Sequence, residues 1–124
     1  MRSYTLLELV ITVVIVGVLA TLGFINYSSY REGALDREAS ANLRLIIAAE
    51  RIYRIEVGAY YAAADNAAIN TNFRLMLPVS GTINWNYLTT ASGGSTCGQA
   101  TRSTAARTWR LRVTESDPSS GTCP

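Results

Sequence analysis

The sequence contains no histidine and no lysine, and it has only two cysteines among its 124 residues. Without histidine the chain lacks the side chain that most often serves as a general base or metal ligand near neutral pH. No nucleophile–base pair, phosphate-binding loop or pair of carboxylates stands out, so we expect neither enzymatic activity nor a cofactor. The net charge of +2 is too small to indicate a nucleic-acid partner.

Charge is nearly absent from the first quarter of the chain. Of the 20 charged residues, only Arg2 and Glu8 lie among the first 30, and residues 9–30 carry none. Residues 9–25 are apolar apart from two threonines, which is just long enough for a membrane-spanning helix. The segment is a signal peptide, a permanent anchor, or a helix that leaves the membrane later. A signal peptide is disfavoured because the run is long and begins with an acid.

The apolar run continues into an amphipathic pattern, and no proline occurs before Pro78. Apolar residues recur at helical spacings of three and four at Leu35, Ala39, Leu43, Ile46, Ala49, Tyr53 and Val57. Gly58 follows as a suitable C-terminal cap. We predict one helix over about residues 4–57, apolar all round in its first half. The spacing of Glu50 and Arg54 also predicts a surface ion pair.

The remainder of the chain predicts a small sheet. Residues 59–81 read as a connecting loop that is rich in alanine and asparagine. Period-two alternation follows at Ile83, Trp85 and Tyr87, and again at Trp109, Leu111 and Val113. A third strand is expected over about 96–103. The predicted fold class is α+β, with an antiparallel sheet of about three strands packed on the C-terminal half of the long helix.

The N-terminal motif is specific. The segment Ser3-Tyr-Thr-Leu-Leu-Glu-Leu9, with the apolar run that follows it, resembles the N-terminus of type IV pilins and the related pseudopilins. The resemblance implies that residues 1–3 are a leader, which a prepilin peptidase removes between Ser3 and Tyr4, and that Tyr4 is then N-methylated. Two positions depart from the family pattern, since Ser3 stands where glycine is preferred and Ile25 where proline is common.

The resemblance also implies a role for three residues in assembly. Glu8 would neutralise the N-terminal amine of a neighbouring subunit, and Thr5 and Gly17 would lie in the same contacts between subunits. The chain then divides into the leader, an apolar membrane and filament-core helix (4–30), and a globular domain (31–124) that includes the amphipathic half of the helix.

The expected function is that of a major pilin, the structural subunit of a type IV pilus-like filament. Its expected partners are identical subunits, the inner membrane that holds it before assembly, the peptidase and the assembly machinery. Its final location would be an extracellular filament on the cell surface. The alternatives are a pseudopilin or minor pilin of a secretion or DNA-uptake machine, and a membrane-anchored binding domain that does not polymerise.

A pilin-like chain places its globular domain outside the cytoplasm, where disulfides persist, so we expect Cys97 and Cys123 to be bonded. No metal site is expected, because histidine is absent and Asp65, Glu115 and Asp117 lack the spacing of calcium ligands. Four arginines without an intervening acid, at Arg102, Arg107, Arg110 and Arg112, are interpreted as a solvated strand face and loop rather than a DNA-binding patch.

Overall fold

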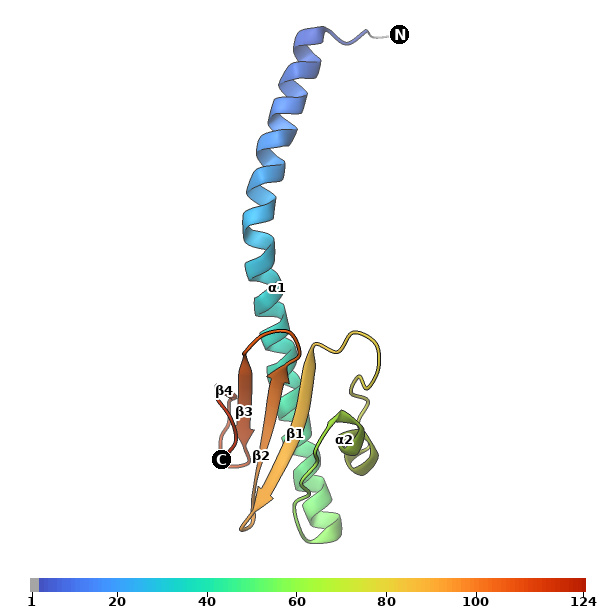
Figure 1. The fold of residues 1–124 in the computed structure, drawn as a ribbon, viewed down its shortest axis with the longest axis vertical. Coiled ribbons are helices and arrows are strands. Elements are labelled where there is room, and N and C mark those ends of the chain that lie inside the picture. The colour runs from blue at the N-terminus through green and yellow to red at the C-terminus, as the bar shows by residue number, and fades with distance from the viewer. Residues whose placement is uncertain (1–2) are drawn as a thin grey trace. The chain divides into compact units, whose positions relative to one another are not determined.

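The computed structural model describes residues 3–124, apart from the side chain of Ile25. Met1 and Arg2, which belong to the expected leader, lie outside the described residues. The elements are α1 (Leu6–Val57), α2 (Asn66–Phe73), β1 (Trp85–Ser92), β2 (Ser95–Arg102), β3 (Thr108–Arg112) and β4 (Ser119–Ser120) (Figure 1). The predicted α+β class is confirmed. Contacts divide the chain into two compact units, one ending at Leu35 and the other running from Asp36 to Pro124.

Helix α1 is continuous from Leu6 to Val57, through both glycines of the apolar segment. It begins at Leu6, two residues later than predicted, because Thr5 caps its first turn. Its predicted end is confirmed. Gly58 has a φ of 94°, which glycine adopts readily, and its N–H donates to the carbonyl of Arg54 at 2.8 Å.

The sheet is fully antiparallel in the order β1-β2-β3-β4. Strands β1 and β2 form a hairpin in which Ser92 pairs with Ser95. Gly93 and Gly94 between them have φ of 56° and 80°, the left-handed values that a tight two-residue hairpin turn needs. A fourth strand exceeds the predicted three, because Ser119 and Ser120 of the C-terminal tail pair with β3.

The predicted loop over 59–81 is partly wrong, since it contains helix α2. Asp65 caps this helix by accepting the Ala68 N–H at 2.8 Å. Asn66 is buried, and its amide donates to the carbonyl of Pro78 at 2.8 Å and accepts the N–H of Tyr87 at 2.7 Å. Asn66 therefore connects α2 to the chain beside it.

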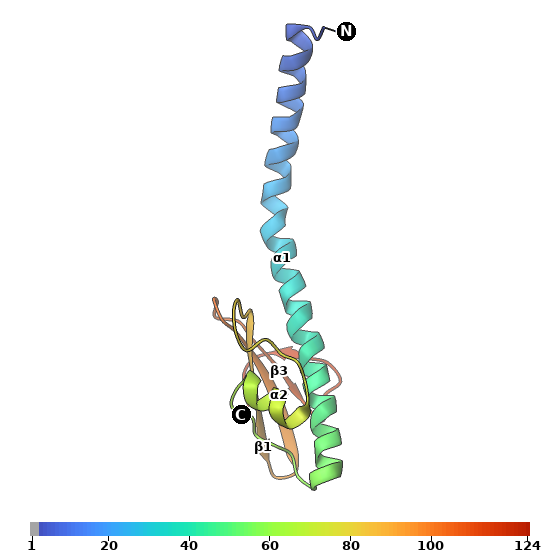
Figure 2. The ribbon, with the colours of Figure 1, turned by 90° about the vertical axis from the view of Figure 1, so that its right-hand side faces the viewer.

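The core of the second unit lies between the sheet and α1 (Figure 2). Its largest buried side chains include Trp85 and Tyr87 of β1, which face the helix as predicted. Gly98 of β2 lies so close to α1 that an added Cβ would be 3.3 Å from Leu43. The predicted apolar stripe is buried from Leu35 to Ile46, whereas Val57 at its end is 60% exposed.

Candidate functional site

Residues 6–24 of α1 form a surface that is apolar all round. Every large apolar side chain in this range is exposed, from 48% for Val10 to 85% for Phe24. The helix is long and apolar enough to cross a membrane. Such a surface is far larger than the apolar patches that soluble monomers expose, so it requires lipid or other helices around it.

The two threonines of this segment have their hydroxyls satisfied within the helix. Thr12 donates to the carbonyl of Leu9 at 2.8 Å, and Thr21 donates to that of Val18 at 2.8 Å. Neither hydroxyl therefore needs water, and both tolerate lipid or a helix–helix contact. Apart from its chain neighbours and the nearby backbone of its own helix, Gly17 has no atom within 4 Å of where a Cβ would stand, so this chain by itself does not require glycine there.

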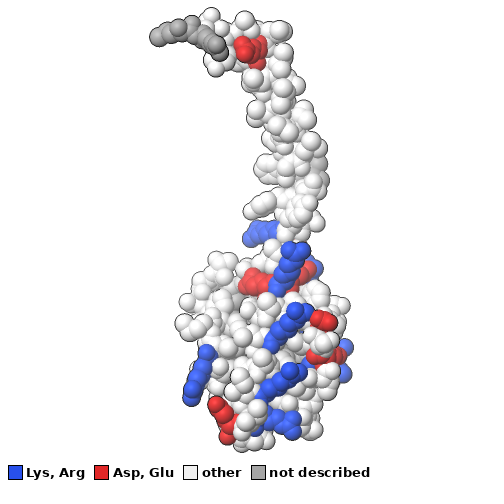
Figure 3. Space-filling model, turned by 180° about the vertical axis from the view of Figure 1, so that it is seen from behind, with Lys and Arg blue, Asp and Glu red and all other residues white. Residues whose placement is uncertain are grey.

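Among the residues to which the N-terminal motif assigns a role, Tyr4 and Thr5 lie just before α1 and Glu8 lies in its first turn. Tyr4 is 80% exposed, and Glu8 lies exposed in the first helical turn. Thr5 caps the helix, because its hydroxyl accepts the N–H of Glu8 at 3.3 Å and its carbonyl accepts that of Leu9 at 3.2 Å. Figure 3 shows the surface of this segment as uncharged apart from one acidic patch. The structure thus brings Thr5 and Glu8 together, and Gly17 lies further along the helix.

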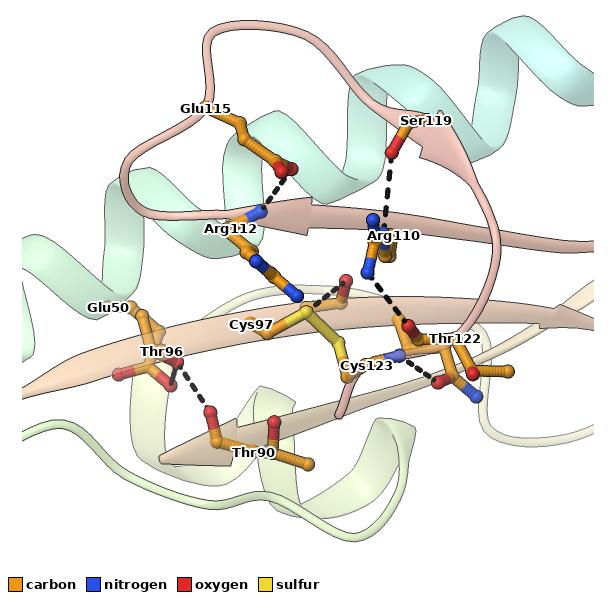
Figure 4. The surroundings of a disulfide bond; sticks show 12 residues. Glu50, Thr90, Thr96, Cys97, Arg110, Arg112, Glu115, Ser119, Thr122 and Cys123 are labelled. Carbon is orange, nitrogen blue, oxygen red and sulfur yellow. Dashed lines mark hydrogen bonds between the residues drawn. A yellow bond between two sulfur atoms is a disulfide. The ribbon is translucent and has the colours of Figure 1, made fainter. Parts of the chain in front are cut away.

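The predicted disulfide is confirmed, and it joins β2 to the C-terminal tail (Figure 4). Cys97 and Cys123 have Cα atoms 5.9 Å apart. The N–H of Cys123 also donates to the side-chain oxygen of Gln99 at 2.8 Å. Arg110 donates to Ser119 at 3.4 Å and to the carbonyl of Thr122 at 3.3 Å. The bond and these contacts together hold the tail on the outer face of the sheet.

The four clustered arginines are half-buried, which is compatible with arginine stems that cover apolar surface. Arg107 pairs with Asp36 at 2.5 Å, and the indole N–H of Trp109 donates to the same carboxylate at 3.3 Å. Arg102 lies over the ring of Trp85, 5.5 Å from its centre. Because the guanidinium groups of Arg102, Arg107 and Arg110 contact residues of their own unit, the four arginines do not form one open basic patch.

Glu50 is the polar residue whose place the sequence reasoning missed. It is completely buried, and the predicted ion pair with Arg54 is wrong. Its carboxylate accepts the N–H of Tyr61 at 3.1 Å and lies 3.3 Å from the Thr96 hydroxyl. Burial raises the pKa of Glu50, and hydrogen bonds from the Tyr61 backbone, Thr89 and Thr96 oppose that rise. Arg54 instead contacts Tyr60, whose hydroxyl accepts from it at 3.1 Å.

A signal for the burial of Glu50 was present in the sequence. The residue lies four positions after Ile46 and seven after Leu43, so it falls on the same helix face as the predicted apolar stripe. The spacing to Arg54 competed with this signal, and tertiary packing decided between them.

The acids considered as metal ligands have other contacts. Asp65 caps α2, Asp117 pairs with Arg44 at 2.6 Å, and Glu115 accepts the N–H of Arg112 at 3.2 Å. Within residues 3–124, no three His, Cys, Asp or Glu side chains gather in a way that could hold a metal ion.

The long apolar N-terminal helix and the small antiparallel sheet are compatible with a pilin-like fold. Comparison of the chain with protein-family models, with curated proteins and with solved structures gave no match.

Proposed function

We propose that this chain is a pilin-like subunit that the inner membrane holds by its N-terminal helix and that then assembles into an extracellular filament. One observation carries the proposal: residues 6–24 are apolar and exposed on every side, with a single acid, Glu8, at their beginning. A helix that served only as an anchor would have no need of an acid at the edge of its apolar surface, where the charge is costly.

Glu8 is proposed to select the register between subunits. In a bundle of apolar helices, neighbours slide past one another with little change in packing energy. A buried carboxylate removes this freedom, because every stagger that leaves the charge unpaired is penalised. The proposed partner is the amine of Tyr4 in a neighbouring subunit, exposed once residues 1–3 are removed. Thr5 holds the backbone of Glu8 in the first turn and thereby positions its carboxylate.

The same contact repeated from subunit to subunit gives an open fibre, because a heterologous interface that does not close continues indefinitely. Apolar helices would replace lipid in the fibre core, and the disulfide-bonded domains would form its surface. The proposal includes no catalysis, cofactor or nucleic-acid partner. A pseudopilin or minor pilin would use the same contact in a shorter or rarer polymer.

The test compares the full chain with Glu8→Ala and Glu8→Gln in cells that carry a pilus assembly system. Sheared surface material is viewed by electron microscopy, and the N-terminus is identified by mass spectrometry. We expect wild-type filaments that begin at N-methylated Tyr4. Both variants should form at least tenfold fewer filaments while their membrane pool persists. Without the pair between Glu8 and the amine, no stagger between neighbouring subunits is favoured over the others.

Asp117→Asn is the matched control, because it removes a carboxylate whose surface ion pair contributes little. Normal filaments in Glu8→Ala would refute the role of Glu8 in register. Filaments beginning at Met1 would refute the processing step alone. A membrane-bound wild-type chain that never forms filaments would refute the filament and favour an anchored binding domain, which the membrane-length helix also permits.

A further inference from the structure

The second half of α1 carries another apolar stripe, on the side opposite to its core-facing residues. Leu45 is 49% exposed, Ile52 is 59% exposed and Ile55 is 85% exposed. Ala41 and Ala48 are exposed between them. At 100° per residue these five positions lie within one narrow sector, whereas Leu43, Ile46 and Glu50 lie on the opposite, buried side. We call these five residues the outer stripe.

The outer stripe has the spacing of a helix–helix seam. Its members follow one another at intervals of 4, 3, 4 and 3, which is the heptad alternation of a coiled coil. In that notation Leu45 and Ile52 occupy a positions, and Ala41, Ala48 and Ile55 occupy d positions. Counted back along the sequence, the same alternation reaches Phe24, Ala20 and Gly17, with Glu38 and Arg31 as polar interruptions.

Charges border the outer stripe on both sides. Arg44 and Arg51 occupy the g positions on one edge, and Glu56 occupies an e position on the other. Figure 3 shows basic side chains crossing the surface of this unit in a row. Arg44 is paired with Asp117, and Arg51 donates to the carbonyl of Val113 at 2.9 Å, so both side chains are held near this edge.

We infer that the outer stripe packs against the outer stripe of a second copy, helix parallel to helix, while both copies are anchored in the membrane. In a parallel pair, each g residue faces the e residue five positions later on the partner, which brings Arg51 to Glu56 of the other copy. An antiparallel pair would bring arginines to arginines, which is repulsive. The charge pattern therefore favours the parallel arrangement.

Membrane anchoring supplies the other part of the argument, and here the inference rests on the membrane-held subunit of the proposed function. Two copies inserted by the same apolar segment lie parallel and at the same depth. The outer stripe has only five residues per copy, fewer than the roughly 20–30 that each side of a stable interface contributes. It would not hold a dimer in water, but it suffices where the bilayer already confines and aligns its partners.

Disulfide cross-linking of the full chain in membranes tests the inference. Ile52→Cys is compared with Met76→Cys, which replaces a 96% exposed residue away from the outer stripe. We expect mild oxidation to yield a dimer with Ile52→Cys and at least fivefold less with Met76→Cys. Mass spectrometry of the Cys97–Cys123 bond in both variants confirms that the domain is folded.

A charge exchange then tests the orientation. Added to Ile52→Cys, Arg51→Glu should lower the dimer yield at least fivefold, and the further change Glu56→Arg should restore it. A loss of local structure would not be restored in this way. No dimer with Ile52→Cys, equal yields at both positions, or no rescue would overturn the inference. Filament formation by the wild-type chain is scored separately. A failed cross-link therefore refutes the dimer and leaves the proposed function standing. A dimer without filaments supports the dimer and refutes the filament.

Discussion

Glu50 is a buried carboxylate whose surroundings act on its pKa in opposite directions. The Thr96 hydroxyl oxygen lies 3.1 Å from the carbonyl oxygen of Thr90 and 3.3 Å from a carboxylate oxygen of Glu50. It has one hydrogen to share between these two acceptors. The Thr89 hydroxyl donates to the carbonyl of Tyr61 at 2.8 Å. The Tyr61 N–H donates to the Glu50 carboxylate at 3.1 Å. Because burial penalises the charged form more than these hydrogen bonds favour it, the pKa of Glu50 lies above its ordinary value.

The raised pKa of Glu50 makes stability depend on pH. The folded chain keeps a proton that the unfolded chain loses near pH 4.5, so the free energy of unfolding should fall as pH rises from there through the raised pKa. Glu50→Gln should remove this part of the slope, because an amide does not titrate. Urea unfolding between pH 4 and 8 measures it, with exposed Glu56→Gln as control. An unchanged slope in Glu50→Gln would contradict the assignment.

At the scale of elements, β4 depends on its connections. A strand of two residues has too few ladder bonds to persist by itself. The Cys97–Cys123 bond and the contacts of Arg110 hold the tail from which β4 forms. Helix α2 is likewise maintained by its surroundings, since eight residues are too few for an isolated helix in water.

Removal of the disulfide should destabilise the second unit. The bond joins residues 26 positions apart, and the chain-entropy model gives about 3.5 kcal/mol for a loop of that size. We expect the double variant Cys97→Ser/Cys123→Ser to lower the free energy of unfolding by about this amount in urea titrations followed by circular dichroism. A reductant should lower the stability of the wild type in the same way and leave the double variant unchanged. Equal stability of the two chains under oxidising conditions would contradict the estimate.

At the scale of the whole molecule, the two units make different demands on their surroundings. The unit ending at Leu35 buries none of its most apolar window. The unit from Asp36 to Pro124 has its own core of helix and sheet side chains and a disulfide. The first therefore needs an environment that the second does not, which agrees with a subunit that is held by one part and displays the other.

A chain without residues 1–30 should consequently fold and stay soluble. We expect it to be monomeric at micromolar concentration, because the outer stripe is too small to hold a dimer in water. The full chain should require detergent, since its apolar segment has no cover of its own. Sedimentation and circular dichroism of both chains measure this. An unfolded or aggregated short chain would show that the second unit depends on the first.

The elements that follow from local periodicity could be read from the sequence. Three features depend only on neighbours within a few positions of the chain. They are the end of α1 at Val57, the inward alternation of Trp85 and Tyr87, and the apolar segment. The disulfide was expected from the compartment that the N-terminal motif implies. Helix α2 was missed because asparagines that favour turns when exposed are equally able to bond distant backbone groups, as Asn66 does.

The sequence by itself determined which surfaces must be removed from water: the segment at 6–24 and one face each of the second half of α1 and of the strands. Only the tertiary structure decided what covers them and which polar groups go inside. Glu50 lies in the core, Arg107 binds Asp36 and the tail adds a strand, because these outcomes depend on contacts between residues far apart in the chain. Periodicity records that a face needs a partner, and it does not identify that partner.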